Sequence, residues 1–249
     1  MSETHQMRCA EVWGGNARSD FDVCTRGLTA SLISHCSEGE TGGDIYYFSL
    51  CAYDELTRIL LADVRGHGAE AAEIGQWIYE GLEKRMNSLD AAGVLAELNT
   101  LVRERGFPAL TSAVLVSHYQ SGKTLYYSYA GHPPALARRR GAEWTMLTIP
   151  DGAAGPANLP LGVMADTRYD QVEIAVEPGD RVVLYTDGVT ECPGEGAEYL
   201  DIEGLARWLG EAGEVPVENL KREVLRRLRI QAGESLPHDD CTLIALELH

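Results

Sequence analysis

Aspartates stand where several apolar runs of the sequence begin or end. Asp63 ends the run "ILLAD", Asp187 ends "RVVLYTD", and Asp44 follows a double glycine directly before "IYYFSL". Asp239 and Asp240 stand immediately before the apolar run "CTLIALEL". Each aspartate alone is typical of a solvated strand end, but the same arrangement at separate places favours one shared acidic site.

Carboxylates grouped in one site oppose each other's ionisation unless a cation compensates them. Hard divalent cations prefer oxygen ligands, and the sequence has no histidine–cysteine cluster with the spacing of a zinc site. The acids therefore predict a Mg²⁺ or Mn²⁺ site. A hairpin about Asp54 returns the chain to its starting edge, so we expect Asp44 and Asp63 to lie close together on neighbouring strands.

The segments around these acids read as groups of strands separated by groups of helices. Strands are predicted at 8–13, 28–36, 45–53 and 57–62, and later within "LTSAVLVSHY", "KTLYYSYAG", "PALARRR", "EWTMLTI", "YDQVEIAV", "DRVVLYT" and "CTLIALEL". Helical spacing runs from Ala69 to Met86, and a second helix around 95–102 is predicted to begin at Ser88 as N-cap and to stop at Gly106. Two further helices are predicted near 201–210 and 216–231. We infer a single α+β domain over residues 1–249, in which helices cover two antiparallel sheets and the first few residues are disordered.

The bulk composition is that of a soluble globular protein, with 45% hydrophobic and 24% charged residues. The net charge of −17 disfavours nucleic acid and anionic membranes as partners, because both would repel the chain. The start "MSETHQMRCAEVWGG" has no apolar export signal, and no apolar run approaches the roughly 18 residues of a membrane span. We therefore interpret the six scattered cysteines as reduced and expect a cytoplasmic protein.

Six short motifs occur together in one order: "GGD", "ADVRGHG", "AGHPP", "LPLGV", "GDRVVLYTDGVTE" and "HDDCT". Any one of them is common, but the ordered set resembles the PPM metal-dependent serine/threonine phosphatases. The similarity is greater to the bacterial SpoIIE-type branch, which acts in sporulation and stress signalling. It extends from about residue 40 to the C-terminus.

The resemblance implies an α-β-β-α sandwich with a dinuclear Mn²⁺ or Mg²⁺ centre, two ions per chain, at one edge of the sheets. The implied ligands and catalytic acids are Asp44, which would bridge the ions, then Asp63 with the Val64 carbonyl, Asp187 and Asp239. Two such ions can lower the pKa of a bridging water and neutralise charge on the phosphoryl oxygens.

Other polar residues near the motifs are given supporting roles or structural ones. Gly43 and Asp240 are expected to support the centre, and Thr186 and Thr242 to orient its carboxylates. Glu191 is expected to give similar support or to be exposed.

Three segments carry weaker expectations. Arg65 stands where the family usually has a small or apolar residue, and it is either a solvent-facing turn residue or a ligand for substrate phosphate. His132 could contact substrate, although the prolines after it suggest a structural turn. His67 is interpreted as a hydrogen-bonding turn residue. The run "RRR" at 138–140 is expected to be a solvated strand end, with docking of an acidic partner as the alternative.

The expected function is hydrolysis of phosphoserine or phosphothreonine by a metal-bridging hydroxide, since the sequence has neither a GxSxG elbow nor a C(x)₅R phosphate loop. The resemblance implies a phosphorylated regulatory protein as partner, such as an anti-sigma-factor antagonist or a similar partner-switching protein. Two alternatives stay open. One is a catalytically weak pseudophosphatase that serves as a protein-binding module. The other is a metal-dependent phosphodiesterase or nuclease, which the acidic net charge disfavours.

Overall fold

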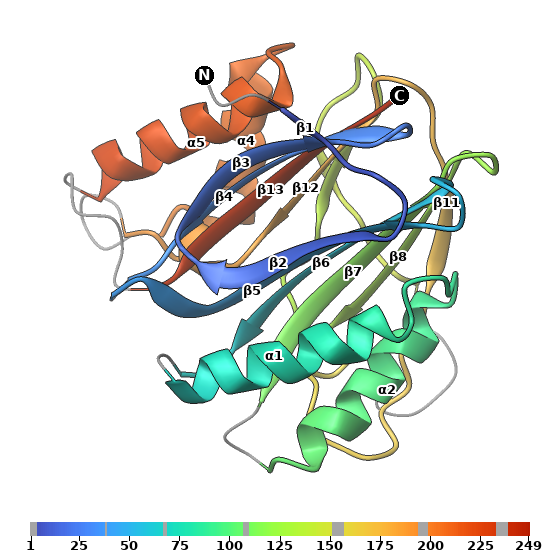
Figure 1. Ribbon diagram of the computed structural model, residues 1–249. Helices are drawn as coiled ribbons and strands as arrows, with labels where there is room; N and C mark the ends of the chain where they lie inside the picture. Colours follow the sequence, from blue (N-terminus) through green and yellow to red (C-terminus); the bar gives the residue numbers. More distant parts are fainter. Residues whose placement is uncertain are drawn as a thin grey trace.

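The apolar runs predicted as strands form two β-sheets that pack face to face in the computed structural model (Figure 1). The structure describes residues 4–37, 39–66, 69–106, 110–150, 157–193, 199–232 and 239–249. The predicted disorder of the first few residues falls largely outside these ranges, and the predicted turn role of His67 falls entirely outside them.

One sheet of the described chain, called sheet A here, has the strand order β1-β3-β4-β13-β12-β9-β10. Its strands are β1 (His5–Gln6), β3 (Ser19–Cys24), β4 (Leu28–His35), β13 (Cys241–Leu248), β12 (Arg181–Tyr185), β9 (Leu136–Arg138) and β10 (Thr145–Met146). The sheets are antiparallel as predicted, except that the two-residue edge strand β1 pairs parallel to β3. The strand predicted within "EWTMLTI" is only the short β10, and β3 was not predicted.

The second sheet, sheet B, has the order β11-β8-β7-β6-β5-β2 among the described residues. Its strands are β11 (Val172–Ala175), β8 (Thr124–Ala130), β7 (Thr111–Tyr119), β6 (Leu56–Val64), β5 (Thr41–Cys51) and β2 (Glu11–Ala17). The central strands β5 and β6 are buried along nearly their whole length. Burial on both faces explains why they are continuous apolar runs instead of alternating ones.

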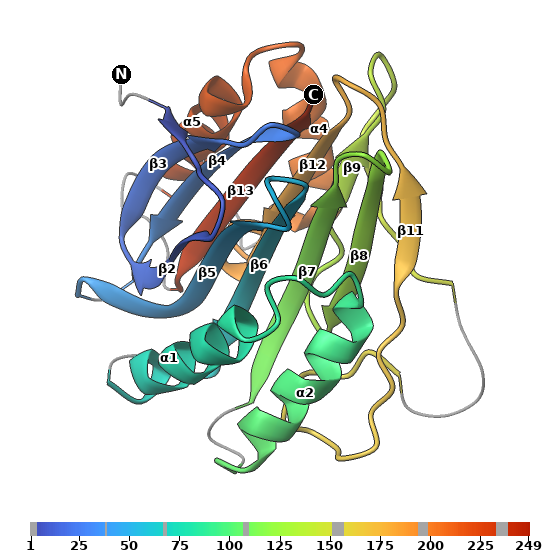
Figure 2. The same ribbon diagram turned by 45° about the vertical axis from the view of Figure 1, so that its right-hand side comes forward.

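Helices cover the outer face of each sheet (Figure 2). Helices α1 (Ala69–Glu83) and α2 (Ala91–Arg103) pack on sheet B, while α4 (Asp201–Ala212) and α5 (Val217–Gln231) pack on sheet A. A short helix, α3 (Asp187–Thr190), follows β12 and was not predicted. The described chain thus forms the layers helix, sheet, sheet, helix, and the predicted α-β-β-α sandwich is confirmed. None of the described helices combines the length and apolar character that a membrane span requires.

Three apolar clusters hold these layers together. The largest lies between the two sheets, and it includes Leu32, Phe48, Ile59 and Leu184. The others lie under α1 and α2 and under α4 and α5. Burying a large aliphatic side chain contributes about 1.5–3 kcal/mol, so the clusters supply much of the free energy that packs the helices and sheets together.

The caps of the second helix differ from the prediction. Its N-cap is Asp90, whose side chain accepts a hydrogen bond from the backbone amide of Gly93, so the prediction of Ser88 is wrong by two residues. Ser88 instead accepts a hydrogen bond from the amide of Asp90. Aspartate and serine are equally good N-cap residues, so residue type alone could not decide between Asp90 and Ser88. The structure shows that the helix begins after Asp90.

Candidate metal centre

Asp44 and Asp63 are directly opposed residues of the antiparallel strands β5 and β6. The hairpin that joins them turns through Ala52, Tyr53 and Asp54, all of which have positive φ angles. The β5–β6 register therefore brings both carboxylates to one edge of sheet B, as the hairpin prediction required. Asp44 is buried and Asp63 is partly buried.

Sheet A contributes Asp187 and Asp239 at the same edge. Asp187 begins α3 directly after β12, and Asp239 stands two residues before β13, which pairs with β12. Both charges act on Asp63, which shows that the two sheets bring their acidic ends together. The sandwich packing thus gathers aspartates from distant parts of the chain.

A hydroxyl group joins the two sheets at this edge. The side chain of Thr186 donates a hydrogen bond of 2.8 Å to the Asp44 carboxylate. The same oxygen accepts a hydrogen bond of 3.0 Å from the backbone amide of Thr242. Thr242 in turn donates from its hydroxyl to Ser34, at 2.9 Å. Thr186 therefore orients Asp44, and the side chain of Thr242 also hydrogen-bonds to Asp44 and opposes the rise in its pKa, so both threonines orient this carboxylate as predicted.

Asp240 is buried, and its carboxylate is already occupied by hydrogen bonds. It accepts from the amide and the hydroxyl of Ser37, at 2.7 and 2.9 Å, and from the amide of Gly43. These bonds hold the segment before Asp44 against the start of β13. Ser37 was not singled out from the sequence, because its partner is more than two hundred positions away and no local pattern marks it.

Glycines allow the backbone segments of the centre to approach one another. A Cβ atom at Gly43 would lie 2.6 Å from the Val64 carbonyl oxygen, which therefore points toward the segment before Asp44. A Cβ atom at Gly188 would lie 1.9 Å from the carbonyl oxygen of Asp240. Both distances are too short for any side chain. The glycines beside the acids are therefore required by close packing.

Burial and mutual repulsion raise the pKa values of three of the acids. Burial, and then the charge of Asp63, raise the pKa of Asp44 well above that of an ordinary aspartate. Burial, and then the charges of Asp187 and its neighbours, raise the pKa of Asp63 to about 7. Burial and the nearby Asp239 also raise the pKa of Asp187. A bound cation would reverse each of these effects.

The donor set of this edge fits a hard divalent cation, since it consists of carboxylate and carbonyl oxygens. In the part of the chain that the structure describes, no three acidic, histidine or cysteine side chains converge closely enough to hold one ion. The hydrogen bonds explain part of this separation: Asp44 is drawn to Thr186, Asp240 to Ser37, and Asp239 to the amide of Asp240. Mutual repulsion separates carboxylates in the same way. The backbone positions fit a metal centre, and side-chain rotation would have to complete it.

The two residues predicted to contact substrate, Arg65 and His132, lie outside the group of acids. Arg65 is exposed on the loop after β6, and its backbone amide donates to the carbonyl of Leu110. His132 lies at the same edge of sheet B as Asp63 but after β8, two strands or roughly 10 Å away. It is buried, and burial lowers its pKa to about 4. Burial favours a structural turn for His132, while the role of Arg65 stays a prediction.

Two further predictions concern Glu191 and the arginine run at 138–140. Glu191 is exposed, and its charge raises the pKa of the nearby Asp187. The "RRR" run forms ion pairs within the chain: Arg138 with Glu214 at 2.9 Å, and Arg139 with Asp180 at 2.5 Å. Arg138 is buried, so the prediction of a solvated strand end is wrong for this residue, whereas Arg139 and Arg140 are exposed as predicted. The two ion pairs disfavour the docking of an acidic partner.

Comparison with known proteins assigns the family. A model described as Stage II sporulation protein E (SpoIIE) matches residues 53–249. The chain belongs to the SpoIIE family. This membership agrees with the ordered motifs and with the PPM-type sandwich, and the predicted resemblance to the SpoIIE-type branch of PPM phosphatases is confirmed.

Individual relatives support the same conclusion. This SpoIIE-family chain is 30% identical over 217 residues to the phosphoserine phosphatase RsbU of Bacillus subtilis, a match that covers 83% of this chain and 59% of RsbU. The structure of the RsbU and RsbW domains of a Mycobacterium tuberculosis protein aligns with a TM-score of 0.73 at 23% identity, over 94% of this chain and 61% of that one. RsbX in complex with magnesium aligns with a TM-score of 0.69 at 16% identity, over 93% of this chain and 100% of that one. The two solved structures establish likeness of fold. The chain spans less than two thirds of RsbU and of the mycobacterial protein.

Proposed function

We propose that this chain is a protein serine/threonine phosphatase that uses Mn²⁺ or Mg²⁺ to hydrolyse phosphoserine or phosphothreonine in a regulatory protein. The observation that carries the proposal is the direct pairing of Asp44 and Asp63 on neighbouring strands. Asp187 and Asp239 lie near this pair, close enough for their charges to act on Asp63. Family membership supports it, as does the name of RsbU as a phosphoserine phosphatase. The magnesium found with RsbX supports the choice of a divalent cation.

Each residue of the centre has a stated role in this proposal. The residues that would hold two ions are Asp44, Asp63, the Val64 carbonyl, Asp187 and Asp239. When bound, such ions supply an acidified water and positive charge against the phosphoryl oxygens. The chain itself orients Asp44 through Thr186 and holds Gly43 through Asp240.

Four of the six cysteines are poorly suited to form a covalent intermediate, which favours hydrolysis by water. Cys36, Cys51, Cys192 and Cys241 are buried. Burial raises the pKa of each of these thiols, in Cys51 to about 11. The thiolate is the nucleophilic form, so these side chains are poor nucleophiles at neutral pH. Cys241 adjoins the acids, and their negative charges raise its pKa further.

The proposed substrate is a phosphorylated anti-sigma-factor antagonist or a similar partner-switching protein. A solved relative that contains both an RsbU and an RsbW domain supports a role in such a system. The test is phosphate release from a panel of phosphopeptides and phosphoproteins, with Mn²⁺ and with a chelator. We expect Mn²⁺-dependent release. If neither this panel nor p-nitrophenyl phosphate is hydrolysed, the chain is a pseudophosphatase that binds its partner without turnover.

A further inference from the structure

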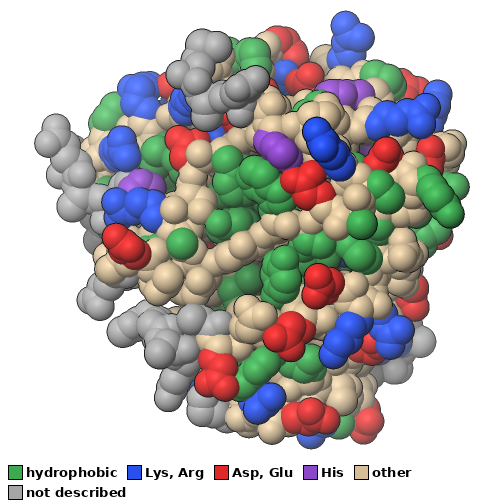
Figure 3. All heavy atoms as spheres, in the orientation of Figure 1, with side chains coloured by type: hydrophobic (Ala, Val, Ile, Leu, Met, Phe, Trp, Pro, Cys, Tyr) green, Lys and Arg blue, Asp and Glu red, His purple; other side chains and the backbone are tan. Residues whose placement is uncertain are grey.

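A groove of about 990 Å³ lies between α5 and the strands β3 and β4. Its lining comes from the start of β3 and the residue before it (Arg18, Ser19, Asp20), from the end of β4 and the two residues after it (residues 33–37), and from one face of α5 (Arg222, Leu225, Arg226, Arg229, Ile230). We call it the α5 groove. In Figure 3 several Lys and Arg side chains gather at the left of the molecule, over and below α5 and beside a histidine.

The α5 groove is positively charged in a chain whose net charge is −17. Among the described residues, its lining includes four arginines, Arg18, Arg222, Arg226 and Arg229, and one carboxylate, Asp20. That carboxylate forms an ion pair of 2.7 Å with the buried Lys221, which also pairs with Asp22, so the lysine offsets only part of the charge of Asp20.

Three of these four arginines have no ion-pair partner among the described residues, so their charges are available to a ligand. Only Arg226 has an ion-pair partner among the described residues, Glu223 at 2.7 Å. Within the same described residues, no carboxylate lies at ion-pair distance from Arg18, Arg222 or Arg229. The "RRR" run differs, since Arg138 and Arg139 are paired within the chain.

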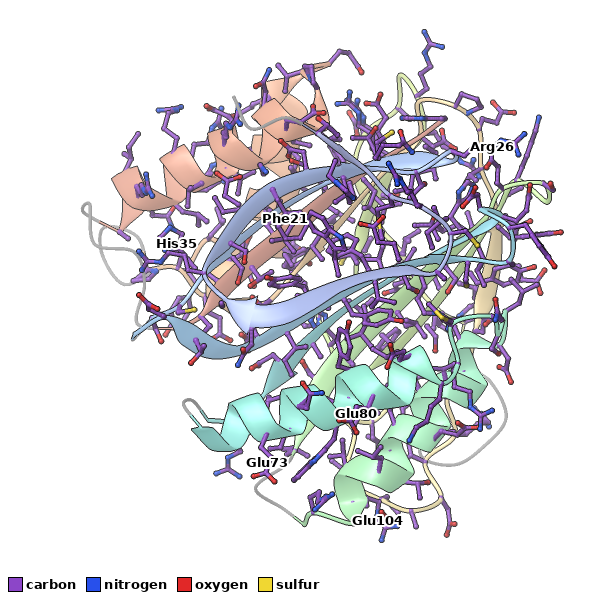
Figure 4. All side chains as sticks on the ribbon, in the orientation of Figure 1. Phe21, Arg26, His35, Glu73, Glu80 and Glu104 are labelled. Atoms are coloured by element: carbon purple, nitrogen blue, oxygen red, sulfur yellow. The ribbon has the colours of Figure 1, made fainter. Side chains whose placement is uncertain are left out.

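The positive charges line both walls of the groove. Arg222, Arg226 and Arg229 follow helical spacing on one face of α5, over about 10 Å of helix axis. His35 lies beneath this helix (Figure 4) and contacts the Arg229 guanidinium at 3.5 Å. Burial lowers the pKa of His35, and the charges of Arg18 and Arg229 lower it further, so cations approach the ring from both walls.

Apolar side chains lie between these charges. Ile33 and Leu225 line the groove, and Ile230 is 65% exposed beside Arg229. Arginine is enriched at surfaces that bind proteins, and the buried core of such surfaces is apolar. A stretch of about 10 Å accommodates three or four residues of extended peptide. The negative charge of the whole chain disfavours nucleic acid in the same place, because a long polyanion would be repelled outside the groove.

One residue of the groove lining contacts a residue next to the candidate metal centre. Ser37 donates both its amide and its hydroxyl to the Asp240 carboxylate, which also accepts from the amide of Gly43. His35 is paired with Cys241 on the adjacent strand β13. A peptide lying in the groove would therefore be near the segment that carries Asp239 and Asp240.

We propose that the α5 groove docks an acidic segment of the phosphoprotein substrate, adjacent in that protein to the phosphorylated residue. The inference rests on the proposed function and adds to it the chemistry of the partner. Carboxylates of the segment bind Arg18, Arg222 and Arg229, and an apolar residue of the segment packs on Ile230. The acidic metal centre repels such a segment, so the groove supplies the attraction that holds the phosphoprotein near the acids.

The experiment compares Arg222→Glu/Arg229→Glu with a control of equal charge change, Arg103→Glu/Arg207→Glu, whose exposed arginines lie on α2 and α4. Binding of a fluorescein-labelled, unphosphorylated peptide with a glutamate run and two leucines is measured by anisotropy, without metal. Kinetics are measured with Mn²⁺ on p-nitrophenyl phosphate and on phosphoserine peptides that carry glutamate or glutamine runs on either side. Circular dichroism verifies that each variant is folded.

We expect the groove variant to bind the acidic peptide about tenfold more weakly, because each reversal replaces an attraction with a repulsion. Its kcat/KM should fall about tenfold on an acidic phosphopeptide and stay unchanged on p-nitrophenyl phosphate and on the glutamine peptides. High salt should reduce the difference. Equal peptide binding by the wild type and the groove variant, or an equal loss in the control variant, would overturn the proposal. The binding measurement decides the groove even if the wild type hydrolyses nothing, an outcome that would contradict only the proposed function.

Discussion

Thr186 and Asp44 belong to different sheets, and one hydrogen bond of 2.8 Å joins them. Thr186 follows β12 of sheet A, and Asp44 lies in β5 of sheet B. The threonine hydroxyl also accepts from the amide of Thr242, so it sets the separation between the acidic ends of the two sheets. The geometry of the candidate centre therefore depends on a residue that is not itself expected to bind metal.

Thr186→Val should destabilise the protein by about 1–3 kcal/mol, because it leaves the buried amide of Thr242 without its partner and removes one of the hydrogen bonds to Asp44. Urea denaturation measures this change. Thr186→Ser keeps the hydroxyl and is the matched control, expected to retain most of the stability. A valine variant as stable as the wild type would show that the hydrogen bond does not hold the sheets.

Gly188→Ala should destabilise the protein by about 1–3 kcal/mol and lower phosphatase activity, because a Cβ atom would lie 1.9 Å from the backbone of Asp240. The start of β13 would have to move away from Asp187. Gly210→Ala is the control, since no atom lies within 4 Å of its Cβ position in α4. That change should stabilise the helix by about 0.5–1 kcal/mol. Similar unfolding free energies for both variants would contradict this account.

Asp187→Asn should bind Mn²⁺ more weakly and lose at least about a hundredfold in activity, given that changes to residues behind metal ligands already cost ten- to a hundredfold. The fold should persist, and thermal stability without metal should not fall, because the change removes a charge that Asp239 repels. Isothermal titration with Mn²⁺ should show at least two ions for the wild type. Full Mn²⁺-dependent turnover by the variant would rule out a metal-binding role for Asp187.

Arg65→Ala tests whether this exposed arginine binds the substrate phosphate. A charge-assisted contact contributes about 1.5–3 kcal/mol, so kcat/KM on a phosphoprotein should fall roughly ten- to a hundredfold at saturating Mn²⁺. Metal affinity should not weaken, since Arg65 itself repels cations. Unchanged kcat/KM would make Arg65 a surface residue, and a loss of Mn²⁺ binding would make its role structural.

Helix α1 is expected to respond to metal or partner binding. It packs directly behind Asp44, since a Cβ atom at Gly75 would lie 3.0 Å from the side chain of Ile45. Gly75 and Gly81 also weaken the helix by about 1 kcal/mol each relative to alanine. We expect hydrogen exchange in α1 to slow when Mn²⁺ or a partner binds, while exchange in α4 on the other sheet stays unchanged. Equal exchange in α1 with and without these ligands would contradict the prediction.

The pattern of apolar residues along the sequence predicted the β5–β6 hairpin correctly but did not predict the short strand β3. The apolar runs on either side of Asp54 predicted the register that pairs Asp44 with Asp63, because a tight turn fixes which residues face each other. The same reasoning missed β3, whose sequence "SDFDVC" carries two aspartates. Asp22 is nevertheless buried, and Lys221 of α5 neutralises it at 2.7 Å. A partner 199 positions away cannot be inferred from the strand itself.

The sequence by itself determined the acids at the strand ends, the β5–β6 hairpin and the family, because each depends on neighbouring residues or on ordered motifs. Only the tertiary structure brought Asp187 and Asp239 toward Asp63, placed Ser37 on Asp240 and set Arg18 across from α5. These relationships arise where β4 pairs with β13 and where the two sheets pack. Such contacts join segments far apart in the chain, and their free energy comes from burying apolar faces that many other pairings could bury equally well. Only the packing of the whole chain selects among those pairings.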